Sequence, residues 1–395
     1  MKILKGKAKL LTLAGHEMAV YTDEFWTSRQ RQASSLHEIS YRACFKPQLP
    51  RYFIERLTQP GDVVYDPFSG RGTTAIEAAL LGRQVIANDA NPLSAILSFP
   101  RLYPPDLVEI KERLHQIPNK TPSHNAPDLE MFYHPKTFEE IWSLRAYLKS
   151  RVKSGKEDGV DRWIRMVATN RLTGHSPGFF SVYTLPPNQA VSAERQKEIN
   201  RGRKQKATYR DVHALILRKS HQLTRNLTEL QKSNLKGALT TALFTCGPAS
   251  RVESVPSNHV HLTVTSPPFL DIVQYSSDNW LRCWFNNIDV KAIASGITMS
   301  RTVEEWSGIM QSVFHELFRM TRRGGWVAFE VGEVRNGRIK LEEVAVPLGL
   351  KAGFACPAVF INRQKFTKTA NIWGVKNNTA GTNTNRIALF QKPHA

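Results

Sequence analysis

Val63-Val-Tyr-Asp-Pro-Phe-Ser-Gly-Arg-Gly-Thr-Thr74 is the stretch that decides the fold of this chain. Its apolar start predicts a buried strand, its two glycines allow a tight turn, and the residues from Thr73 to Leu81 favour a helix. A second apolar run, Val85 to Ala87, predicts another strand, which ends at Asp89. Strand, glycine turn, helix and strand form the start of a βαβ unit, so the sequence predicts an α/β domain.

The glycine turn is of the kind that binds a nucleotide or nucleoside cofactor, and it leaves two interpretations open. Gly70 to Ala75 fits the dinucleotide fingerprint with alanine in the third position, which is typical of nicotinamide enzymes. Asp66 favours S-adenosylmethionine, because a carboxylate can bind the charged amino group of a methionine moiety but would repel a pyrophosphate. Asp89 lies where an acidic side chain binds the ribose hydroxyls.

The second informative stretch is Thr265-Ser-Pro-Pro-Phe269. Two consecutive prolines fix φ near about −65° and remove two backbone N–H groups, so this loop presents acceptors in fixed directions. The Ser266 hydroxyl and the Pro267 carbonyl could accept both hydrogens of a nucleobase amino group, and Phe269 could stack on the base. An amine attacks a sulfonium methyl directly, so this chemistry requires positioning and electrostatic support but no nucleophilic side chain. The alternative interpretation is an ordinary turn after a strand.

Together, these stretches resemble the amino-group DNA methyltransferases that modify cytosine N4 or adenine N6. Four segments carry the resemblance: Phe45-Lys46-Pro47 is similar to motif X, Asp66 to Thr74 to motif I, Asp89 to motif II, and Ser266 to Phe269 to motif IV. The resemblance implies a Rossmann-like α/β methyltransferase fold with a seven-stranded sheet, S-adenosyl-L-methionine as cofactor, DNA as substrate and no metal. It also associates serine at the start of motif IV most often with cytosine N4.

The sequence departs from the family pattern at two places. Arg71 stands between the glycines, where a small residue is usual. Gly247-Pro248 follows a predicted strand at the point where many relatives carry an acidic residue for the adenine of the cofactor. With a neutral serine in motif IV, we expect water or a backbone carbonyl to take the proton that the amine loses.

The motifs and the resemblance define the expected site. The expected catalytic residues are Ser266, Pro267, Pro268 and Phe269. The expected cofactor-binding residues are Phe45, Lys46, Pro47, Asp66, Pro67, Phe68, Ser69, Gly70, Gly72, Thr73, Thr74, Asp89 and Asn91. Cytosine C5 methylation is not expected, because it needs a nucleophilic cysteine after a proline and none of the 4 cysteines follows one.

Basic residues are concentrated in the middle of the chain. The net charge is +20, and residues 145–236 hold twenty Lys and Arg against seven Asp and Glu. The run from Arg195 to Arg210 predicts contact with nucleic-acid phosphates, and a solvated linker loop is the alternative. The expected nucleic-acid-binding residues are Arg195, Lys197, Arg201, Arg203, Lys204, Lys206 and Arg210.

The strand and helix pattern predicts two domains. Residues 1–100 and 240–395 would form the cofactor-binding catalytic domain, and residues 101–239 an inserted, largely helical target-recognition domain. Within the insertion, helices are predicted over 138–153, 160–172 and 213–235. The loop from Gly174 to Asn188 either faces the active site or is a packed connector. No apolar run approaches a membrane span and the cysteines are scattered, so we expect a soluble, cytoplasmic protein.

The sequence therefore predicts a site-specific DNA methyltransferase that acts on the exocyclic amine of a base flipped out of double-stranded DNA, with cytosine N4 as the favoured target. The alternatives are an adenine N6 DNA methyltransferase, an RNA base-amine methyltransferase and a non-catalytic nucleic-acid-binding protein. A restriction-modification setting fits the family, but neither a restriction partner nor an oligomeric state follows from the sequence.

Overall fold

The computed structural model describes residues 8–13, 15–26, 33–41, 44–124, 126–184, 190–268, 279–290, 300, 302–331, 333–334, 339–363 and 384–394. Within these residues, nine strands form one sheet in the order β1-β2-β10-β11-β7-β6-β3-β4-β5. In that order the strands span Ala8–Leu13, His16–Asp23, Ala355–Arg363, Thr384–Gln391, Thr321–Val331, Val260–Thr265, Val63–Asp66, Gln84–Asp89 and Leu243–Cys246. A separate pair consists of β8, Glu333–Val334, and β9, Ile339–Lys340.

The centre of the sheet is parallel. Strands β7, β6, β3, β4 and β5 pair in parallel, while β11 runs antiparallel to its neighbours β7 and β10. All four residues of β3 are buried, as expected for a strand covered by helices on both faces. The predicted Rossmann-like α/β architecture is therefore confirmed.

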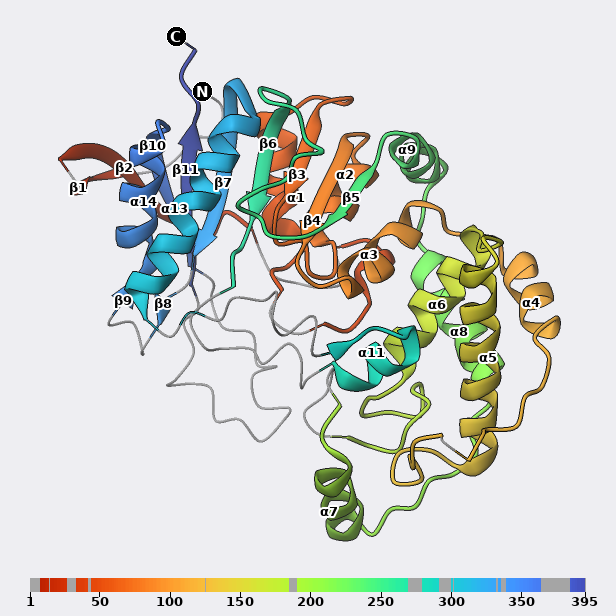
Figure 1. Ribbon diagram of the computed structural model, residues 1–395. Coiled ribbons are helices and arrows are strands. Elements are labelled where there is room, and N and C mark those ends of the chain that lie inside the picture. The colour runs from red at the N-terminus through yellow and green to blue at the C-terminus, as the bar shows by residue number, and fades with distance from the viewer. Residues whose placement is uncertain are drawn as a thin grey trace.

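The sheet has two strands more than the seven expected from the sequence. Strands β1 and β2 form an antiparallel hairpin, and β2 pairs in parallel with β10, which extends the seven expected strands at one edge. The prediction missed this hairpin because its apolar and polar residues do not alternate clearly, and within β2 only Met18 and Tyr21 are buried. The hairpin lies at the left edge of the sheet in Figure 1.

Helices cover both faces of the sheet. Helices α1 (Gln48–Leu57) and α2 (Thr73–Leu80) pack on one face, and α13 (Val303–Met320) and α14 (Leu341–Lys351) pack on the other. Figure 1 shows α13 and α14 in front of the sheet. Side chains alternate between the two cores along each strand. Val264 of β6 and Ala328 of β7, for example, belong to the core under α1 and α2, whereas Phe329 of β7 belongs to the other.

The chain between β4 and β5 is mostly helical, as predicted. It contains α3 (Leu93–Ser98), α4 (Leu107–His115), α5 (Pro135–Lys153), α6 (Gly159–Arg171), α7 (Ala193–Arg203), α8 (Val212–Thr224) and α9 (Glu229–Leu239). The single helix predicted over 213–235 is wrong. It is two helices, because Thr228 caps a new helix by accepting a hydrogen bond from the Gln231 amide, and the Gln231 side chain bonds back.

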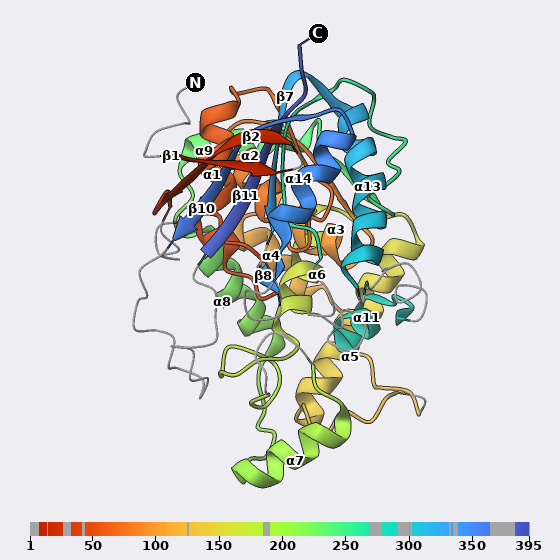
Figure 2. The same cartoon turned by 90° about the vertical axis from the view of Figure 1, so that its left-hand side faces the viewer.

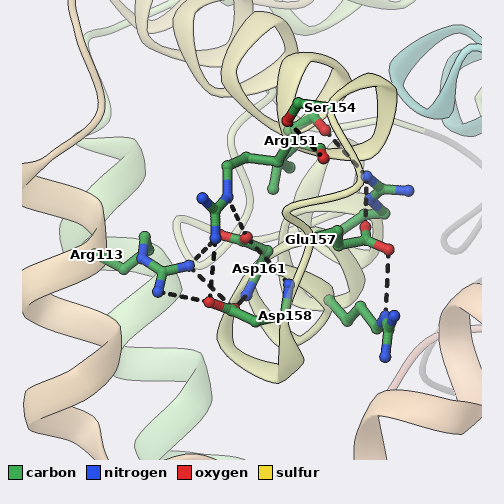
Figure 3. Close-up of polar contacts among 9 residues, drawn as sticks. Arg113, Arg151, Ser154, Glu157, Asp158 and Asp161 are labelled. Atoms are coloured by element: carbon green, nitrogen blue, oxygen red, sulfur yellow. Dashed lines mark hydrogen bonds and ion pairs between the residues drawn. The ribbon is translucent and has the colours of Figure 1, made fainter.

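A cluster of charged side chains links α4, α5 and α6 (Figure 3). Arg113 of α4 and Arg151 of α5 both reach Asp158 and Asp161 at the start of α6, and Asp161 is fully buried. Asp158 also caps α6 by accepting a hydrogen bond from the Asp161 amide at 2.9 Å. The cluster therefore sets both the start of α6 and its packing against α4 and α5.

The helices of the insertion do not form a separate core. One continuous cluster of buried side chains includes Trp163 of α6 and Leu215 of α8 together with Ile76 of α2 and Leu262 of β6. Helix α9 also contacts α2, where Asn234 donates a hydrogen bond to the Leu80 carbonyl at 3.0 Å. The insertion and the sheet are packed through shared apolar side chains.

Candidate active site

The glycine turn has the conformation that its sequence predicts. Gly70 and Gly72 have φ of 52° and 74°, in the left-handed region that glycine adopts without strain. A Cβ atom on Gly72 would lie 2.3 Å from the Ser98 hydroxyl oxygen, so the close approach to α3 also requires glycine. Gly72 directly precedes α2, so the backbone N–H groups of Thr73 and Thr74 lie at the start of that helix.

Asp89 holds the turn from the end of β4. Its carboxylate accepts hydrogen bonds from the Gly70 amide at 2.7 Å and from the Asn91 amide at 2.8 Å. Burial raises the pKa of Asp89 to about 6, although these two amides favour its charged form. The structure thus brings Asp89 beside Gly70 and Asn91, three of the residues predicted to bind the cofactor.

Asp66 links the glycine turn to the second motif. It is buried at the end of β3, where the Thr265 hydroxyl donates a hydrogen bond to Asp66 Oδ1 at 2.6 Å. Burial raises the pKa of Asp66 to about 7, and the bond from Thr265 partly opposes that increase. Strands β3 and β6 are parallel neighbours, so Asp66 and Ser266 leave the sheet side by side at its carboxyl edge.

The Pro-Pro loop is fixed from both sides. The Thr74 hydroxyl donates a hydrogen bond to the Val264 carbonyl at 3.0 Å, and the indole of Trp306 in α13 donates to the Pro268 carbonyl at 3.1 Å. Pro267 is buried, Ser266 and Pro268 are half-buried, and Phe269 lies outside the described residues. The structure therefore places three of the four predicted catalytic residues at the same edge of the sheet as the glycine turn.

Several predicted cofactor residues carry buried polar atoms that lack a hydrogen-bond partner among the described residues. These atoms are Asp66 Oδ2, Ser69 Oγ and Asn91 Nδ2. An unpaired buried polar group costs about 1–3 kcal/mol, so three of them around one turn indicate a polar ligand. The set combines a carboxylate oxygen, a hydroxyl and an amide, which fits a ligand that has both donors and acceptors.

The segment predicted to resemble motif X lies at the start of α1. Pro47 precedes the first residue of α1, and Phe45 packs against the core under α1 and α2. Lys46 is half-buried, and its pKa is lowered by burial and by the nearby charge of Arg71. The segment therefore lies near Arg71 of the glycine turn.

Arg71, the residue that departs from the family pattern, has a structural role. Its buried guanidinium donates hydrogen bonds to the Ile39 carbonyl at 3.0 Å and to the His37 carbonyl at 3.4 Å. These bonds hold the residues before α1 against the glycine turn, so that Tyr41 contacts Gly70.

Two residues of this region were missed in the sequence. Glu330 of β7 is buried and accepts a hydrogen bond from the Asn385 side-chain amide of β11 at 2.5 Å. Ser266 follows Thr265, which pairs with Phe329, so Ser266 lies beside Glu330 and favours the charged form of its carboxyl, whose pKa burial raises to about 7. A signal was present, because Glu330 interrupts the apolar run from Trp326 to Val331 near the carboxyl end of the strand.

The basic run lies mostly on α7, at the end of the molecule away from the C terminus (Figure 2). Six of the seven residues predicted to bind nucleic acid are exposed: Arg195, Lys197, Arg201, Arg203, Lys204 and Lys206. Arg210 is half-buried and donates hydrogen bonds to the Ser176 and Phe179 carbonyls. The first part of the run, through Arg203, is thus helical, whereas Lys204, Lys206 and Arg210 follow α7, and Arg210 holds a neighbouring segment.

The described part of the Gly174–Asn188 loop is a packed connector. Phe179 and Phe180 are buried, and the Arg171 guanidinium lies 3.9 Å from the centre of the Phe179 ring. Burial and the charge of Arg171 lower the pKa of His175, which favours its neutral form. Residues 185–189 lie outside the described part of the chain.

The described residues contain neither a metal-binding cluster nor a helix that could span a membrane. No group of three or more His, Cys, Asp or Glu side chains in them could hold a metal ion. None of the helices described is both long and apolar enough to span a bilayer.

Comparison with known proteins gives one family match. Residues 7–94 match the N6/N4 methyltransferase family model, described as DNA methylase. These residues include the motif X segment, the glycine turn, Asp89 and Asn91.

Curated relatives and solved structures are also similar. The Type II methyltransferase M.MjaII of Methanocaldococcus jannaschii is 33% identical over 95 residues, which are 24% of this chain and 18% of that protein. The Type II methyltransferase M.BsoBI of Geobacillus stearothermophilus is 24% identical over 324 residues, which are 73% of this chain and 60% of that protein. The structure of TTHA0409, a putative DNA modification methylase from Thermus thermophilus, matches at 24% identity with a TM-score of 0.25, covering 38% of this chain and 53% of that one.

The chain spans less than two thirds of the length of the curated relatives that it matches. The matches nevertheless include the segment that carries the glycine turn and its acidic partners. Residues 7–94 of the chain are therefore similar to the N6/N4 DNA methylase family, and parts of the chain are similar to Type II methyltransferases.

Proposed function

We propose that the protein transfers the methyl group of S-adenosyl-L-methionine to an exocyclic amine of a DNA base, with cytosine N4 as the favoured target. The observation that carries this proposal is the hydrogen bond between Thr265 and Asp66. It joins a turn suited to a nucleoside cofactor to a loop suited to a base amine, and the two lie at one edge of the sheet. Amine methylation requires those two ligands to meet.

The glycine turn and its neighbours would hold the cofactor. Asp66 Oδ2 and the Ser69 hydroxyl supply acceptors for the amino group of the methionine moiety, and Asp89 at the end of β4 supplies acceptors for the ribose hydroxyls. A bound ammonium group would favour the ionised form of Asp66, whose pKa burial raises to about 7. The cofactor supplies an electrophilic methyl group on a positively charged sulfur.

The Thr265–Pro268 loop would hold the base amine. Two hydrogens on the amine match two acceptors, the Ser266 hydroxyl oxygen and the Pro267 carbonyl. Because both lie on a loop fixed by Thr74 and Trp306, the nitrogen lone pair is directed without reorganisation of the protein. Phe269, as a stacking partner of the base, remains a prediction.

The exposed cations of α7 and its neighbours would bind DNA phosphates. Such contacts supply affinity and register without base specificity, so the recognition sequence must be read elsewhere, and we assign that role to the insertion over residues 101–239. The target base must leave the helix stack to reach Ser266, as enzymes that modify a base require. A restriction-modification setting would follow from the Type II relatives.

The experiment that tests this function uses cofactor labelled in its methyl group. The protein is incubated with double-stranded DNA, single-stranded DNA and RNA of matched sequence, and the products are digested to nucleosides and separated. We expect label in N4-methylcytosine from double-stranded DNA. Label in N6-methyladenine, or in RNA alone, would favour the corresponding alternative enzyme. Binding to DNA with neither label transfer nor cofactor binding would support the non-catalytic alternative.

A further inference from the structure

Three polar side chains converge on one face of the sheet at the edge where the proposed site lies. They are Ser266 after β6, Glu330 of β7 and Asn385 of β11. The register pairs Thr265 with Phe329 and Ile387 with Glu330, so the three side chains come from adjacent strands. Their neighbours two positions along each strand, Val264, Ala328 and Ile387, all belong to the core under α1 and α2. Ser266, Glu330 and Asn385 therefore lie on the same face of the sheet as the core under α1 and α2.

A hydrogen bond joins Asn385 to Glu330, and the strand register places Ser266 beside Glu330. The Asn385 amide can only donate to Glu330 Oε1, because its Nδ2 atom makes that bond. Ser266 lies beside Glu330 in the register of β6 and β7, where its hydroxyl can donate to the same carboxyl and favours its charged form. When Glu330 is ionised it is acceptor-only, so the hydroxyl hydrogen of Ser266 must point toward Glu330. Both lone pairs of Ser266 Oγ then face away from the carboxylate and are left for the hydrogens of a bound amine.

We propose that Glu330 takes up, through Ser266, the proton that the target amine loses during methylation. This inference rests on the proposed function and replaces the water or backbone carbonyl expected from the sequence. As the nitrogen forms its bond to the methyl carbon, the carbon–sulfur bond breaks and its electron pair stays on sulfur. The amine becomes positively charged and passes one N–H proton to Ser266 Oγ, while the hydroxyl proton of Ser266 moves to the Glu330 carboxylate. The products are a neutral methylamine and a protonated Glu330.

The surroundings suit a proton acceptor that works near neutral pH. Burial raises the pKa of Glu330 to about 7, while the bonds from Asn385 and Ser266 favour its charged form. Asp66 is the other buried carboxyl on the strands beside Ser266, and Asp89 lies beyond it at the end of β4. On β11, Arg386 is paired with Glu342 of α14, which neutralises that arginine. Measurements must therefore separate the titration of Glu330 from those of Asp66 and Asp89.

The first test uses Glu330→Gln, which keeps the shape and an acceptor for the Ser266 hydroxyl but cannot take a proton. Single-turnover methyl transfer and cofactor binding are measured from pH 5.5 to 9. We expect the wild-type rate to rise with pH and level off above about pH 7, as Glu330 ionises. In Glu330→Gln we expect that rise to disappear and the plateau rate to fall about 100-fold, with cofactor affinity unchanged. An unchanged rate and pH profile would overturn the proposal.

A second variant changes the pKa of the acceptor without removing it. Because the Asn385 bond favours the charged form of Glu330, Asn385→Ala should raise that pKa and move the rise in rate to higher pH. A role of Glu330 in packing alone predicts a lower rate with no such displacement, and that result would overturn the proposal even if Glu330→Gln folded poorly.

The matched control is Glu342→Gln. Glu342 is also a buried glutamate with a raised pKa, but it faces Arg386 and lies on α14. This control should lower stability and leave the pH profile of methyl transfer unchanged. Failure of the wild-type protein to methylate any nucleic acid would count against the proposed function, whereas methylation with an unaltered profile in Glu330→Gln would count against this inference alone.

Discussion

The Thr265 hydroxyl donates a hydrogen bond to Asp66 Oδ1 at 2.6 Å, although the two residues are 199 positions apart in the chain. The bond crosses from β6 to β3, the two parallel strands whose carboxyl ends carry the Pro-Pro loop and the glycine turn. The bond supplies a hydrogen-bond donor to one carboxylate oxygen of Asp66 and favours the charged form of that residue. The geometry of one proposed ligand site therefore depends on a residue of the other.

Thr265→Val should weaken cofactor binding in a pH-dependent way. Valine keeps the shape of threonine but removes the hydroxyl, so the pKa of Asp66 should rise further above 7 and less of it should be ionised at neutral pH. We expect affinity for S-adenosylmethionine to fall about tenfold at pH 7 and to recover toward the wild-type value at pH 9, as measured by calorimetry.

The control for this prediction is Thr263→Val. Thr263 is buried on the same strand, and its hydroxyl has no hydrogen-bond partner among the described residues. Its replacement should leave affinity unchanged. Equal losses in the two variants, or a loss in Thr265→Val that is the same at both pH values, would contradict the role assigned to the bond.

Gly72→Ala should distort the glycine turn. The new Cβ would lie 2.3 Å from Ser98 Oγ, and the left-handed φ of 74° adds strain for any residue with a side chain. We expect a lower unfolding temperature and the loss of measurable cofactor binding. Gly202→Ala is the control, because Gly202 lies in α7 with open space around its Cβ position. Normal cofactor binding by Gly72→Ala would show that the turn does not hold the ligand.

Asp161→Asn should destabilise the protein through the insertion. Asp161 is fully buried and pairs with Arg113 and Arg151, so the amide would leave the two cations with the half-exposed Asp158 as their one remaining shared carboxylate among the described residues. We expect the free energy of unfolding in urea to fall by about 3 kcal/mol. Asp128→Asn, at an exposed pair with Lys197, should change it by less than about 0.5 kcal/mol. Similar changes in the free energy of unfolding for both variants would mean that the charged cluster in Figure 3 contributes little to stability.

Replacing three cations of α7 and the adjacent Lys204 should reduce the salt dependence of DNA binding. The variant changes Arg195, Lys197, Arg201 and Lys204 to Gln and leaves Arg203, which stacks on Tyr183 at 3.8 Å. Each lost phosphate contact should lower the slope of log affinity against log salt by about 0.9, to the same extent for any DNA sequence. A control with Lys111, Arg218, Lys236 and Lys351 changed to Gln has the same net charge. Equal slopes in the two variants would exclude α7 as the phosphate-binding surface.

The sequence was most informative where structure is local. The strand, turn and helix from Val63 to Leu80 could be predicted because glycine, apolar spacing and helix propensity act over a few residues. The placement of Asp66 and Ser266 at one edge of the sheet could also be predicted, since Asp66 ends one strand and Ser266 follows its parallel neighbour.

Features that depend on strand register could not be predicted from the sequence. Glu330 and Asn385 lie near Ser266 only because β7 pairs with β6 and β11 pairs with β7, and no local pattern specifies that alignment. The β1–β2 hairpin was missed because few of its residues are buried. The role of Arg71 depends on carbonyls of residues 37 and 39, which lie across the turn.

The most direct test of one shared site is to measure methyl transfer and cofactor binding together in Ser266→Ala. If the two loops serve one reaction, single-turnover transfer to DNA should fall at least about 100-fold while the dissociation constant for S-adenosylmethionine stays within about twofold of wild type. Transfer at the wild-type rate would contradict the account.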